Sequence, residues 1–312
     1  MGIKFKIMEV IFLGTSGSIP TKRRSLPSLL IEYLNQFYLF DCGEGTQRQM
    51  RFAGINFMRI ENIFITHLHG DHLLGLPGLI QSMDFLEKKG SVNIYGPPGL
   101  KEAIKHMLEI GSFKLNFLKL NVKEVKEGKV LEGDRFVISC VKTIHTENSL
   151  AYCFEEKPKR KFLKERALAL GVPEGRLFSK LQRGEAVKLP NGKIVTPDQV
   201  LSKEIPGRKV VYSGDTRPCE KVIELAKNAD ILIHDSTFLS KDYEESKGFL
   251  HSTAKEAAEV AKKANVKKLF LFHISQRYTK NDYLLEKEAR EIFPESFLAE
   301  DLLRVKVEKH DI

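Results

Sequence analysis

The sequence predicts a layered α/β fold that is rich in β-sheet. Short runs of β-branched and aromatic residues recur along the 312-residue chain, and the later runs alternate with segments of helical periodicity. In the first part of the chain the strand-like runs follow one another closely, as they do in hairpins. This order favours packed layers of sheet and helix over a helical bundle or a Rossmann sheet.

The expected elements can be placed in chain order. Strand-like runs occupy residues 9–14, 28–33, 37–41, 63–66, 92–96, 136–143, 209–214, 231–235 and 268–274. Helix-like runs occupy residues 73–87, 98–110, 160–169, 218–228, 252–264 and 281–292. No internal repeat or low-complexity tract is visible, and the one break in composition is a basic segment after Phe154.

Composition favours an intracellular enzyme without a membrane anchor. No run of 18 or more apolar residues occurs, so no transmembrane helix is expected. The first residues lack the layout of a signal peptide. The cysteines are scattered without a CxxC pair, which favours reduced thiols in the cytoplasm over disulfides or a thiolate zinc site. They are Cys42, Cys140, Cys153 and Cys219.

The net charge is unevenly distributed. Lys and Arg number 50 against 41 Asp and Glu, a surplus of nine. Residues 155–208 hold 13 Lys and Arg against seven Asp and Glu, so this segment carries two thirds of the surplus. Such a surplus can be only a solvated surface, and it can also serve a polyanionic partner.

The stretch "IFITHLHGDHLLGLPGL" (63–79) concentrates possible metal ligands. His67, His69, Asp71 and His72 stand within six residues of a chain that has only nine histidines. A single histidine here would be interpreted as a hydrogen-bonded surface or core residue, but three histidines so close together favour a divalent metal site. The preceding run predicts a strand, Gly70 allows a sharp turn, and Asp71 suits the start of the following helix.

Three further candidates share this position at the end of a strand. "VISCVKTIH" ends at His145, "KVVYSGD" at Asp215 and "KLFLFH" at His273. Each alone could be a turn residue or a satisfied histidine. Their common placement predicts one site at the edge of a layered sheet, built from four strand ends.

These motifs resemble the metallo-β-lactamase superfamily. HxHxDH, a distant His, a strand ending "SGDT" and a late His occur in that family's order. The resemblance implies an α/β fold of the metallo-β-lactamase type, a four-layer αβ/βα sandwich with a two-metal site between the sheets, over one domain of residues 1–312.

A narrower resemblance is to the ribonuclease Z (tRNase Z) family in its short form, the endonucleases of tRNA 3′ processing. It is carried by segments in the family's order. They are "FLGTSGSIPTKRRSLPSLL", "FDCGEGTQRQM" (40–50), "SGDTRPC" (213–219), "HDSTF" (234–238), "HSTAKEAAEVA" (251–261) and "LFHISQRY" (271–278).

The resemblance implies a specific set of roles. One Zn²⁺ would be held by His67, His69 and His145. A second would be held by Asp71, His72 and His273, and Asp215 would bridge the two. Asp71 would also orient or deprotonate the attacking water.

His251 would donate a proton to the leaving 3′ oxygen or stabilise the phosphate. The alternative is that His251 has no catalytic role and simply precedes a helix whose N-cap is Ser252. For the substrate, the resemblance implies contacts from Lys22, Arg24, Ser252 and Thr253.

Two positions depart from the family pattern. Ser25 stands where the basic loop Pro-x-Lys-x-Arg-Asn has Asn, and Asp235 stands where the family has Glu after His234. Asp is one methylene shorter, so a role for Asp235 in holding His251 is an open question. Both changes could alter how the RNA 3′ end is seated.

The resemblance also gives the basic segment a role. In this family an insertion between the second and third ligand blocks forms a flexible arm that grips the tRNA away from the cut. Residues 155–206 would be this tRNA-binding arm, with Arg176, Lys180 and Arg183 among its contacts. A solvated surface insertion is the alternative.

The resulting hypothesis is a zinc endoribonuclease that removes the 3′ trailer of precursor tRNA. It would use two Zn²⁺ per chain, leave a 3′ hydroxyl on the tRNA and a 5′ phosphate on the trailer, and form a homodimer. One alternative is a thioester or lactam hydrolase, which leaves the basic arm and "HST" unexplained. Another is a nucleic-acid-binding protein with structural zinc, which the lack of a closed Cys₄ or Cys₂His₂ set disfavours.

Overall fold

The computed structural model describes residues 7–110 and 114–310. The chain forms two compact units. The main unit runs to Glu155 and resumes from Lys209 to Glu308. The smaller unit runs from Glu156 to Arg208, and Lys309 and His310 group with it.

Two seven-stranded sheets form the centre of the main unit. The first has the order β20-β1-β3-β4-β5-β6-β7 and the second β19-β17-β16-β15-β10-β9-β8. The strands of the first are Arg304–Lys306, Met8–Gly14, Ser28–Tyr33, Gln36–Phe40, Ile60–Phe64, Ser91–Gly96 and Lys119–Glu124. Those of the second are Ser296–Leu298, Lys268–Phe272, Ile231–Asp235, Lys209–Tyr212, Leu150–Glu156, Phe136–Lys142 and Gly128–Glu132.

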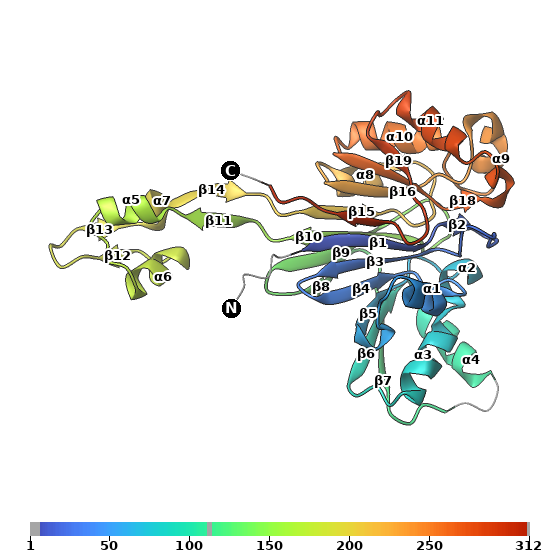
Figure 1. Ribbon diagram of the computed structural model, residues 1–312, viewed down its shortest axis with the longest axis horizontal. Coiled ribbons are helices and arrows are strands. Elements are labelled where there is room, and N and C mark those ends of the chain that lie inside the picture. The colour runs from blue at the N-terminus through green and yellow to red at the C-terminus, as the bar shows by residue number, and fades with distance from the viewer. Residues whose placement is uncertain (1–6, 111–113, 311–312) are drawn as a thin grey trace. The chain divides into compact units, whose positions relative to one another are not determined.

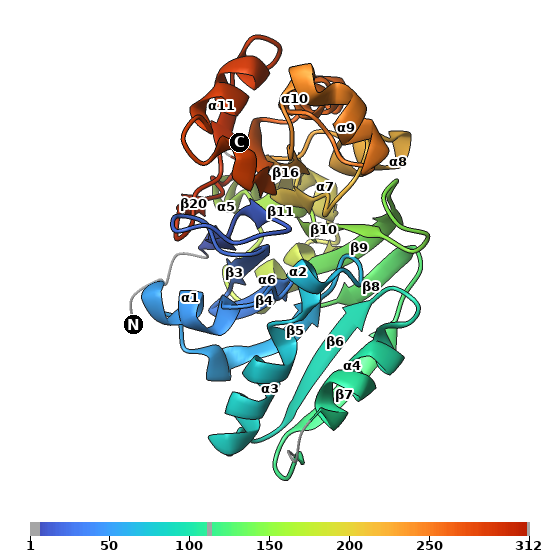
Figure 2. The same cartoon turned by 90° about the vertical axis from the view of Figure 1, so that its right-hand side faces the viewer.

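Helices cover the outer faces of both sheets (Figures 1 and 2). On the first sheet lie α1 (Thr46–Phe52), α3 (Leu76–Phe85) and α4 (Leu100–Glu109). On the second lie α8 (Glu220–Ala226), α10 (Ala254–Lys263) and α11 (Tyr283–Arg290). Shorter pieces are α2 (Gly70–Leu73), α9 (Tyr243–Gly248) and a small ladder of β2 (Ser16–Gly17) with β18 (Ile274–Ser275). The layers are therefore helix, sheet, sheet, helix.

Alternation along the strands builds the core between these layers. On β1, Val10 and Phe12 face the opposite sheet, while Ile11 and Leu13 face the helices of their own side. On β16, Ile231 faces the opposite sheet and Leu232 faces α8, α10 and α11. A sheet that is buried on both faces requires such continuous apolar runs. The predicted four-layer arrangement is confirmed.

The smaller unit has a hydrophobic cluster of its own. Its strands are β11 (Lys159–Phe162), β12 (Val187–Lys188), β13 (Ile194–Val195) and β14 (Leu201–Ile205), and its helices are α5 (Lys164–Ala169), α6 (Arg176–Gln182) and α7 (Pro197–Val200). β11 pairs with β14, and β12 with β13. Leu181, Val187 and Val195 are among the buried members of the cluster.

Several predicted boundaries need correction. The helix expected at 160–169 begins only at Lys164, because Lys159–Phe162 pairs as a strand with Leu201–Ile205. The helix expected at 73–87 is α3, which begins only at Leu76, and the separate short helix α2 ends at Leu73. Among the described residues, no helix is both long and apolar enough to cross a membrane.

Candidate metal centre

Four strand ends meet at one edge of the paired sheets. β5 ends at Phe64 and leads into His67, His69, Asp71 and His72, with α2 starting at Gly70. His145 follows β9, Asp215 follows β15 and His273 follows β17. The structure thus brings together the seven residues that the sequence singled out.

One oxygen lies at the centre of this cluster. Four imidazole Nε2 atoms surround Oδ2 of Asp215, at 3.2 Å for His273, 3.3 Å for His72, 3.6 Å for His67 and 3.7 Å for His145. The Asp215 side chain is almost fully buried. A buried carboxylate within reach of four imidazoles from three other segments is suited to share its charge among cations.

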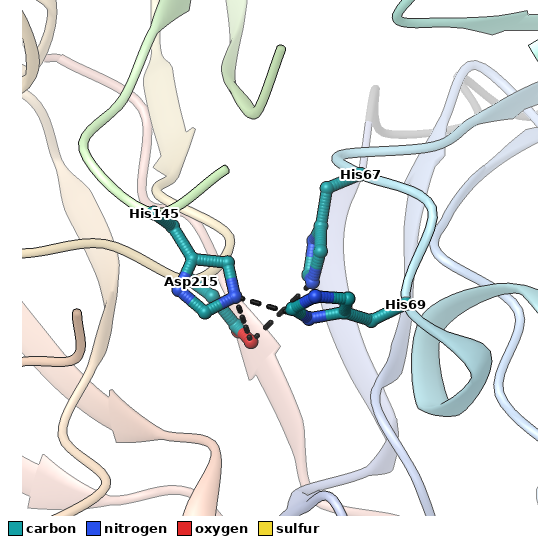
Figure 3. Close-up of side chains that lie close together, drawn as sticks. All are labelled: His67, His69, His145 and Asp215. Atoms are coloured by element: carbon teal, nitrogen blue, oxygen red, sulfur yellow. Dashed lines mark hydrogen bonds and ion pairs between the residues drawn. The ribbon is translucent and has the colours of Figure 1, made fainter. Parts of the chain in front are cut away.

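Three overlapping groups of potential ligand atoms lie within 4.8 Å of one another; one consists of Asp215, Asp235, His251 and His273, and the other two match the two implied ligand sets. In the first set, potential ligand atoms of His67, His69, His145 and Asp215 lie within 4.8 Å of one another. Figure 3 shows the three imidazoles of this set converging on the Asp215 carboxylate. In the second set, Asp71, His72 and His273 meet the same limit. Oδ2 of Asp71 lies 3.6 Å from Nε2 of His72 and 3.3 Å from Nε2 of His273.

Several buried polar atoms of the cluster have no hydrogen-bond partner. Among the described residues these atoms include Nε2 of His67, Nε2 of His72 and Oδ1 of Asp215. Leaving such atoms unpaired in the interior costs free energy, about 1–3 kcal/mol for each group. Neutral imidazole nitrogens and a carboxylate oxygen are what zinc-like divalent ions bind. The residues present therefore fit a divalent metal centre.

The opposite edges of the rings are fixed by hydrogen bonds. Nδ1 of His72 lies 2.7 Å from Oδ2 of Asp41, which also accepts from the Tyr212 hydroxyl over 2.8 Å. The other carboxylate oxygen of Asp41 accepts from the backbone N–H of Thr66. Asp41 has φ of 54°, a left-handed conformation that Asp tolerates better than most residues. These contacts orient the His72 ring with Nε2 toward Asp215.

Three of the four remaining rings, those of His67, His145 and His273, are held in the same way, whereas Nδ1 of His69 lies 3.1 Å from Nε2 of His145. Nδ1 of His67 lies 3.0 Å from Thr66 Oγ1, and Nδ1 of His273 lies 2.8 Å from Thr237 Oγ1. Nδ1 of His145 lies 3.1 Å from the Leu250 carbonyl oxygen. A partner at Nδ1 leaves Nε2 for a ligand, an arrangement common around protein-bound metals. His273 itself has φ of 62°.

Burial and neighbouring charges set the protonation of the cluster before any cation binds. Burial lowers the pKa of His67, His69 and His145, which favours the neutral form that metal binding requires. Burial also disfavours the charged form of His72. The nearby carboxylates of Asp215 and Asp41 outweigh burial, however, and raise the pKa of His72 well above the usual value. Burial also opposes the Asp215 carboxylate, yet His273 and His72 hold its pKa well below the usual range.

His251 lies beside both sets. Its ring centroid is 4.7 Å from that of His145 and 5.0 Å from that of His273. Nδ1 of His251 donates to Oδ2 of Asp235 over 2.8 Å. Burial lowers the pKa of His251, but the Asp235 carboxylate and its hydrogen bond outweigh burial and raise that pKa to about 9. The open question about Asp235 is thus answered, because the shorter side chain does reach His251.

Asp235 is itself held on several sides. Oδ2 accepts from the backbone N–H of Thr216 over 2.9 Å. Oδ1 accepts from the Thr237 hydroxyl over 2.7 Å. The carboxylate that holds His251 is therefore fixed at the end of β16, next to the strand ends that carry Asp215 and His273.

Two residues of the basic loop lie in different environments. Lys22 is exposed. Arg24 is only 5% exposed, and its guanidinium pairs with Asp282 over 2.8 Å and donates to Thr15 Oγ1 over 2.7 Å. These bonds occupy the Arg24 guanidinium inside the protein, so no RNA contact is proposed for Arg24.

The "HST" motif is likewise engaged internally. Ser252 Oγ donates to the Thr216 carbonyl over 2.6 Å. Thr253, not Ser252, is the N-cap of α10 and forms a reciprocal capping box with Glu256. Both residues are buried. The proposed RNA contacts below therefore exclude Arg24, Ser252 and Thr253.

The three cations predicted for the arm lie in the smaller unit. Arg176 and Lys180 belong to α6, and Arg183 follows its last turn. All three are exposed. Their spacing of four and three residues places them along one side of the helix.

Sequence reasoning did not assign the residues that orient the rings. Asp41, Thr66, Tyr212 and Thr237 were given no role. A signal for Asp41 existed, because it follows β4 directly, just as the candidate ligands follow β5, β9, β15 and β17. A polar residue at the end of this fifth strand could have been added to the site.

Comparisons with known proteins agree with the predicted fold. A family model described as a beta-lactamase superfamily domain matches residues 186–274, and one described as the anti-Pycsar protein Apyc1 matches residues 8–161. The metallo-β-lactamase fold protein YhfI from Bacillus subtilis aligns with a TM-score of 0.69 at 19% identity, covering 96% of this chain and 99% of that one. The metallo-β-lactamase fold is confirmed.

Two further likenesses are more specific. The crystal structure of human tRNase Z, short form, aligns with a TM-score of 0.68 at 27% identity, covering 96% of this chain and all of that one. Ribonuclease Z of Methanothermobacter thermautotrophicus is 48% identical over 305 residues, which span 98% of each protein. Such identity along nearly the whole length of both proteins shows that this chain belongs to the ribonuclease Z family.

Proposed function

We propose that this chain is a zinc-dependent endoribonuclease that removes the 3′ trailer from precursor tRNA. Cleavage leaves a 3′ hydroxyl on the tRNA and a 5′ phosphate on the trailer. Family membership supports the reaction class, since the relative at 48% identity is named ribonuclease Z and the human neighbour tRNase Z.

One observation carries the chemical part of the proposal. Oδ2 of Asp215 lies within 3.7 Å of Nε2 atoms from four histidines. A hydrolase acting on lactams or thioesters could share this cluster. The ribonuclease Z relatives and the basic smaller unit favour RNA as the substrate.

Two Zn²⁺ ions would be held by the two sets of residues. His67, His69 and His145 would hold one ion, Asp71, His72 and His273 the other, and Asp215 would contribute to both. When bound, a pair of such ions activates water near neutral pH and neutralises charge on a phosphodiester. Asp41 would keep the His72 ring oriented for its ion.

Asp71 would also act on the attacking water. Its Oδ2 atom faces the Nε2 atoms of His72 and His273, so the carboxylate lies within the candidate centre. A carboxylate there can accept a hydrogen bond from water and orient its lone pair toward the phosphorus. This positioning lowers the entropy cost of the attack.

His251 would serve the leaving group. With Nδ1 hydrogen-bonded to Asp235, Nε2 is the ring nitrogen left for the substrate. When the bond between phosphorus and the 3′ oxygen breaks, the oxygen takes a proton from Nε2 and becomes the 3′ hydroxyl of the tRNA. Asp235 is then a positioning residue, because it fixes the tautomer and the ring plane of His251.

The smaller unit would bind the tRNA through its phosphates. Residues 155–208 carry a net of six positive charges, and Arg176, Lys180 and Arg183 are exposed along α6. RNA helices are recognised mainly by shape and by their phosphate and 2′-hydroxyl groups, so a cationic helix face suits this role. Lys22, exposed on the loop before Arg24, is a further candidate contact near the cut.

Two further parts of the proposal concern assembly and location. The resemblance to the family supports a homodimer, which light scattering on the purified protein would test. The four cysteines are all free thiols in the structure, which supports a reducing compartment such as the cytoplasm.

A cleavage assay tests the function. Precursor tRNA with a 3′ trailer is incubated with the protein, with and without a chelator, and both product ends are mapped. The proposal expects one cut at the trailer junction, a 3′ hydroxyl on the tRNA, a 5′ phosphate on the trailer and loss of cleavage with the chelator. Cleavage that ignores the chelator, or a 2′,3′-cyclic phosphate product, would contradict it.

A further inference from the structure

The loop of residues 15–25 reaches the candidate metal centre through its backbone. The N–H of Ser18 donates to Oδ2 of Asp71 over 2.9 Å. The same oxygen lies 3.3 Å from Nε2 of His273. Ser18 has φ of 56°, a left-handed conformation that a serine keeps only where its surroundings hold it. The hydrogen bond from the Ser18 N–H to Asp71 therefore depends on how firmly the loop is held.

The same loop packs directly on His273. Ser16–Gly17 pairs in parallel with Ile274–Ser275, and the N–H of Ile274 donates to the Thr15 carbonyl over 2.9 Å. A Cβ atom on Gly17 would lie 2.6 Å from Nδ1 of His273, closer than real contacts allow. Only glycine leaves the His273 ring where it is. The loop thus touches Asp71 and His273, two of the three residues in the second set.

Buried charges fix the far end of the loop. Arg24 pairs with Asp282, at the start of α11, over 2.8 Å. Its guanidinium also donates to the Ala299 carbonyl and to Thr15 Oγ1. Both partners of the ion pair are less than 10% exposed. Removing one partner of a buried pair leaves the other charge uncompensated, so the pair resists loosening.

A second, partly buried carboxylate holds the loop beside Arg24. Asp301 accepts from the N–H of Ser25 over 2.7 Å and from Thr15 Oγ1 over 2.8 Å. It also accepts from the side-chain amide of Gln49 on α1 over 2.9 Å. Both ends of the loop are thereby tied to residues 282–301 near the end of the chain. The Ser25 backbone, at the position that departs from the family pattern, is part of this anchor.

We propose that this loop positions the second set of the metal centre. The Ser18 N–H positions Asp71 by donating a hydrogen bond to it, and the close contact with Gly17 positions the His273 ring. The ion pair between Arg24 and Asp282 holds the loop in this conformation. The inference rests on the metal centre of the proposed function and deepens it. Because the contacts go to Asp71 and His273, loosening the loop should weaken one cation site more than the other.

Cobalt titration separates the two sites without relying on RNA cleavage. The protein is stripped of metal, Co²⁺ is added, and visible absorbance and bound Co²⁺ are followed. Gly17→Ala disturbs the contact with His273, and Asp282→Asn disturbs the ion pair with Arg24. Gly78→Ala is the matched control, since a Cβ there meets nothing within 4 Å.

The parent and Gly78→Ala are expected to bind two Co²⁺ ions. Gly17→Ala and Asp282→Asn should keep one tight ion and lose affinity for the other by about 10–100-fold, the usual effect of removing a group that orients a ligand. Should Asp282→Asn fail to fold, Gly17→Ala carries the test alone. Two unchanged sites in a folded Gly17→Ala, or equal weakening of both, would overturn the inference. A parent that binds no Co²⁺ would instead contradict the proposed metal centre.

Discussion

Nδ1 of His72 lies 2.7 Å from Oδ2 of Asp41, and neither side chain is exposed to solvent. The contact joins the end of β4 to α2, the short helix that follows β5. β4 and β5 are parallel neighbours in the first sheet. It gives the imidazole a fixed plane and tautomer, with Nε2 left toward Asp215. Asp41 is therefore a residue through which the fold acts on the candidate centre.

Asp41→Asn tests this relationship. Asn keeps the shape and tolerates the positive φ, but its NH₂ group would face donors from His72, Thr66 or Tyr212. We expect cation affinity to fall by about 10–100-fold, with a corresponding loss of cleavage at limiting zinc. Asp134→Asn, at an exposed position, is the control and should behave like the parent. Parent-like zinc affinity in a folded Asp41→Asn would remove Asp41 from the site.

Asp215→Ala should abolish both metal binding and cleavage. Its Oδ2 atom lies within 3.7 Å of imidazoles from both sets, so truncation removes a ligand from each. Elemental analysis of the purified variant measures the bound zinc. Asp198→Ala, where the side chain is 84% exposed, provides the control. Full zinc occupancy in Asp215→Ala would show that this carboxylate bridges nothing.

His251→Ala should separate catalysis from metal binding. If Nε2 gives the leaving oxygen its proton, kcat should fall by about 10²–10⁴-fold while both zinc ions stay bound. Asp235→Asn should lower kcat in the same direction by a smaller factor, because it only misorients the ring. His106→Ala, on the exposed face of α4, is the control. A near-normal kcat on precursor tRNA would leave His251 as a residue that merely precedes α10.

The smaller unit should contribute binding and not chemistry. Replacing residues 158–202 with a short Gly/Ser linker should leave hydrolysis of bis(p-nitrophenyl) phosphate intact. Cleavage of precursor tRNA should fall through weaker binding, and the salt dependence of tRNA affinity should become shallower because fewer counterions are released.

A finer variant tests the charges alone. Arg176, Lys180 and Arg183 are changed together to Ala, and the control changes Lys101, Lys105 and Lys119, three exposed cations of the main unit. Only the first triple should weaken tRNA binding. Identical binding of the linker variant and the parent across a salt series would exclude an RNA-binding role for this unit.

The sequence predicted the part of the site that is local. Apolar runs such as 231–235 and 268–272 set the buried strands, and polar residues directly after them had to emerge at a sheet edge. The layered fold followed from the same runs. His67, His69, Asp71 and His72 could be found because four ligand-type residues within six positions are rare in a folded chain.

What the sequence did not predict depends on long-range pairing. Arg24 is buried because Asp282, 258 residues away, meets it, and no local pattern reveals that partner. Lys159–Phe162 is strongly basic and suggested a helix, yet it pairs with the distant segment Leu201–Ile205. The strand Lys119–Glu124 was missed because it forms the edge of its sheet and is largely exposed, so its apolar alternation is weak.

Zinc titration of metal-free protein, with trailer release followed in the same samples, tests the central claim most directly. The account predicts no cleavage without zinc, two ions bound per chain, and cleavage that rises until both sites are filled. It also predicts a 3′ hydroxyl on every processed tRNA. Full cleavage by metal-free protein, or full cleavage with one ion bound per chain, would contradict the account.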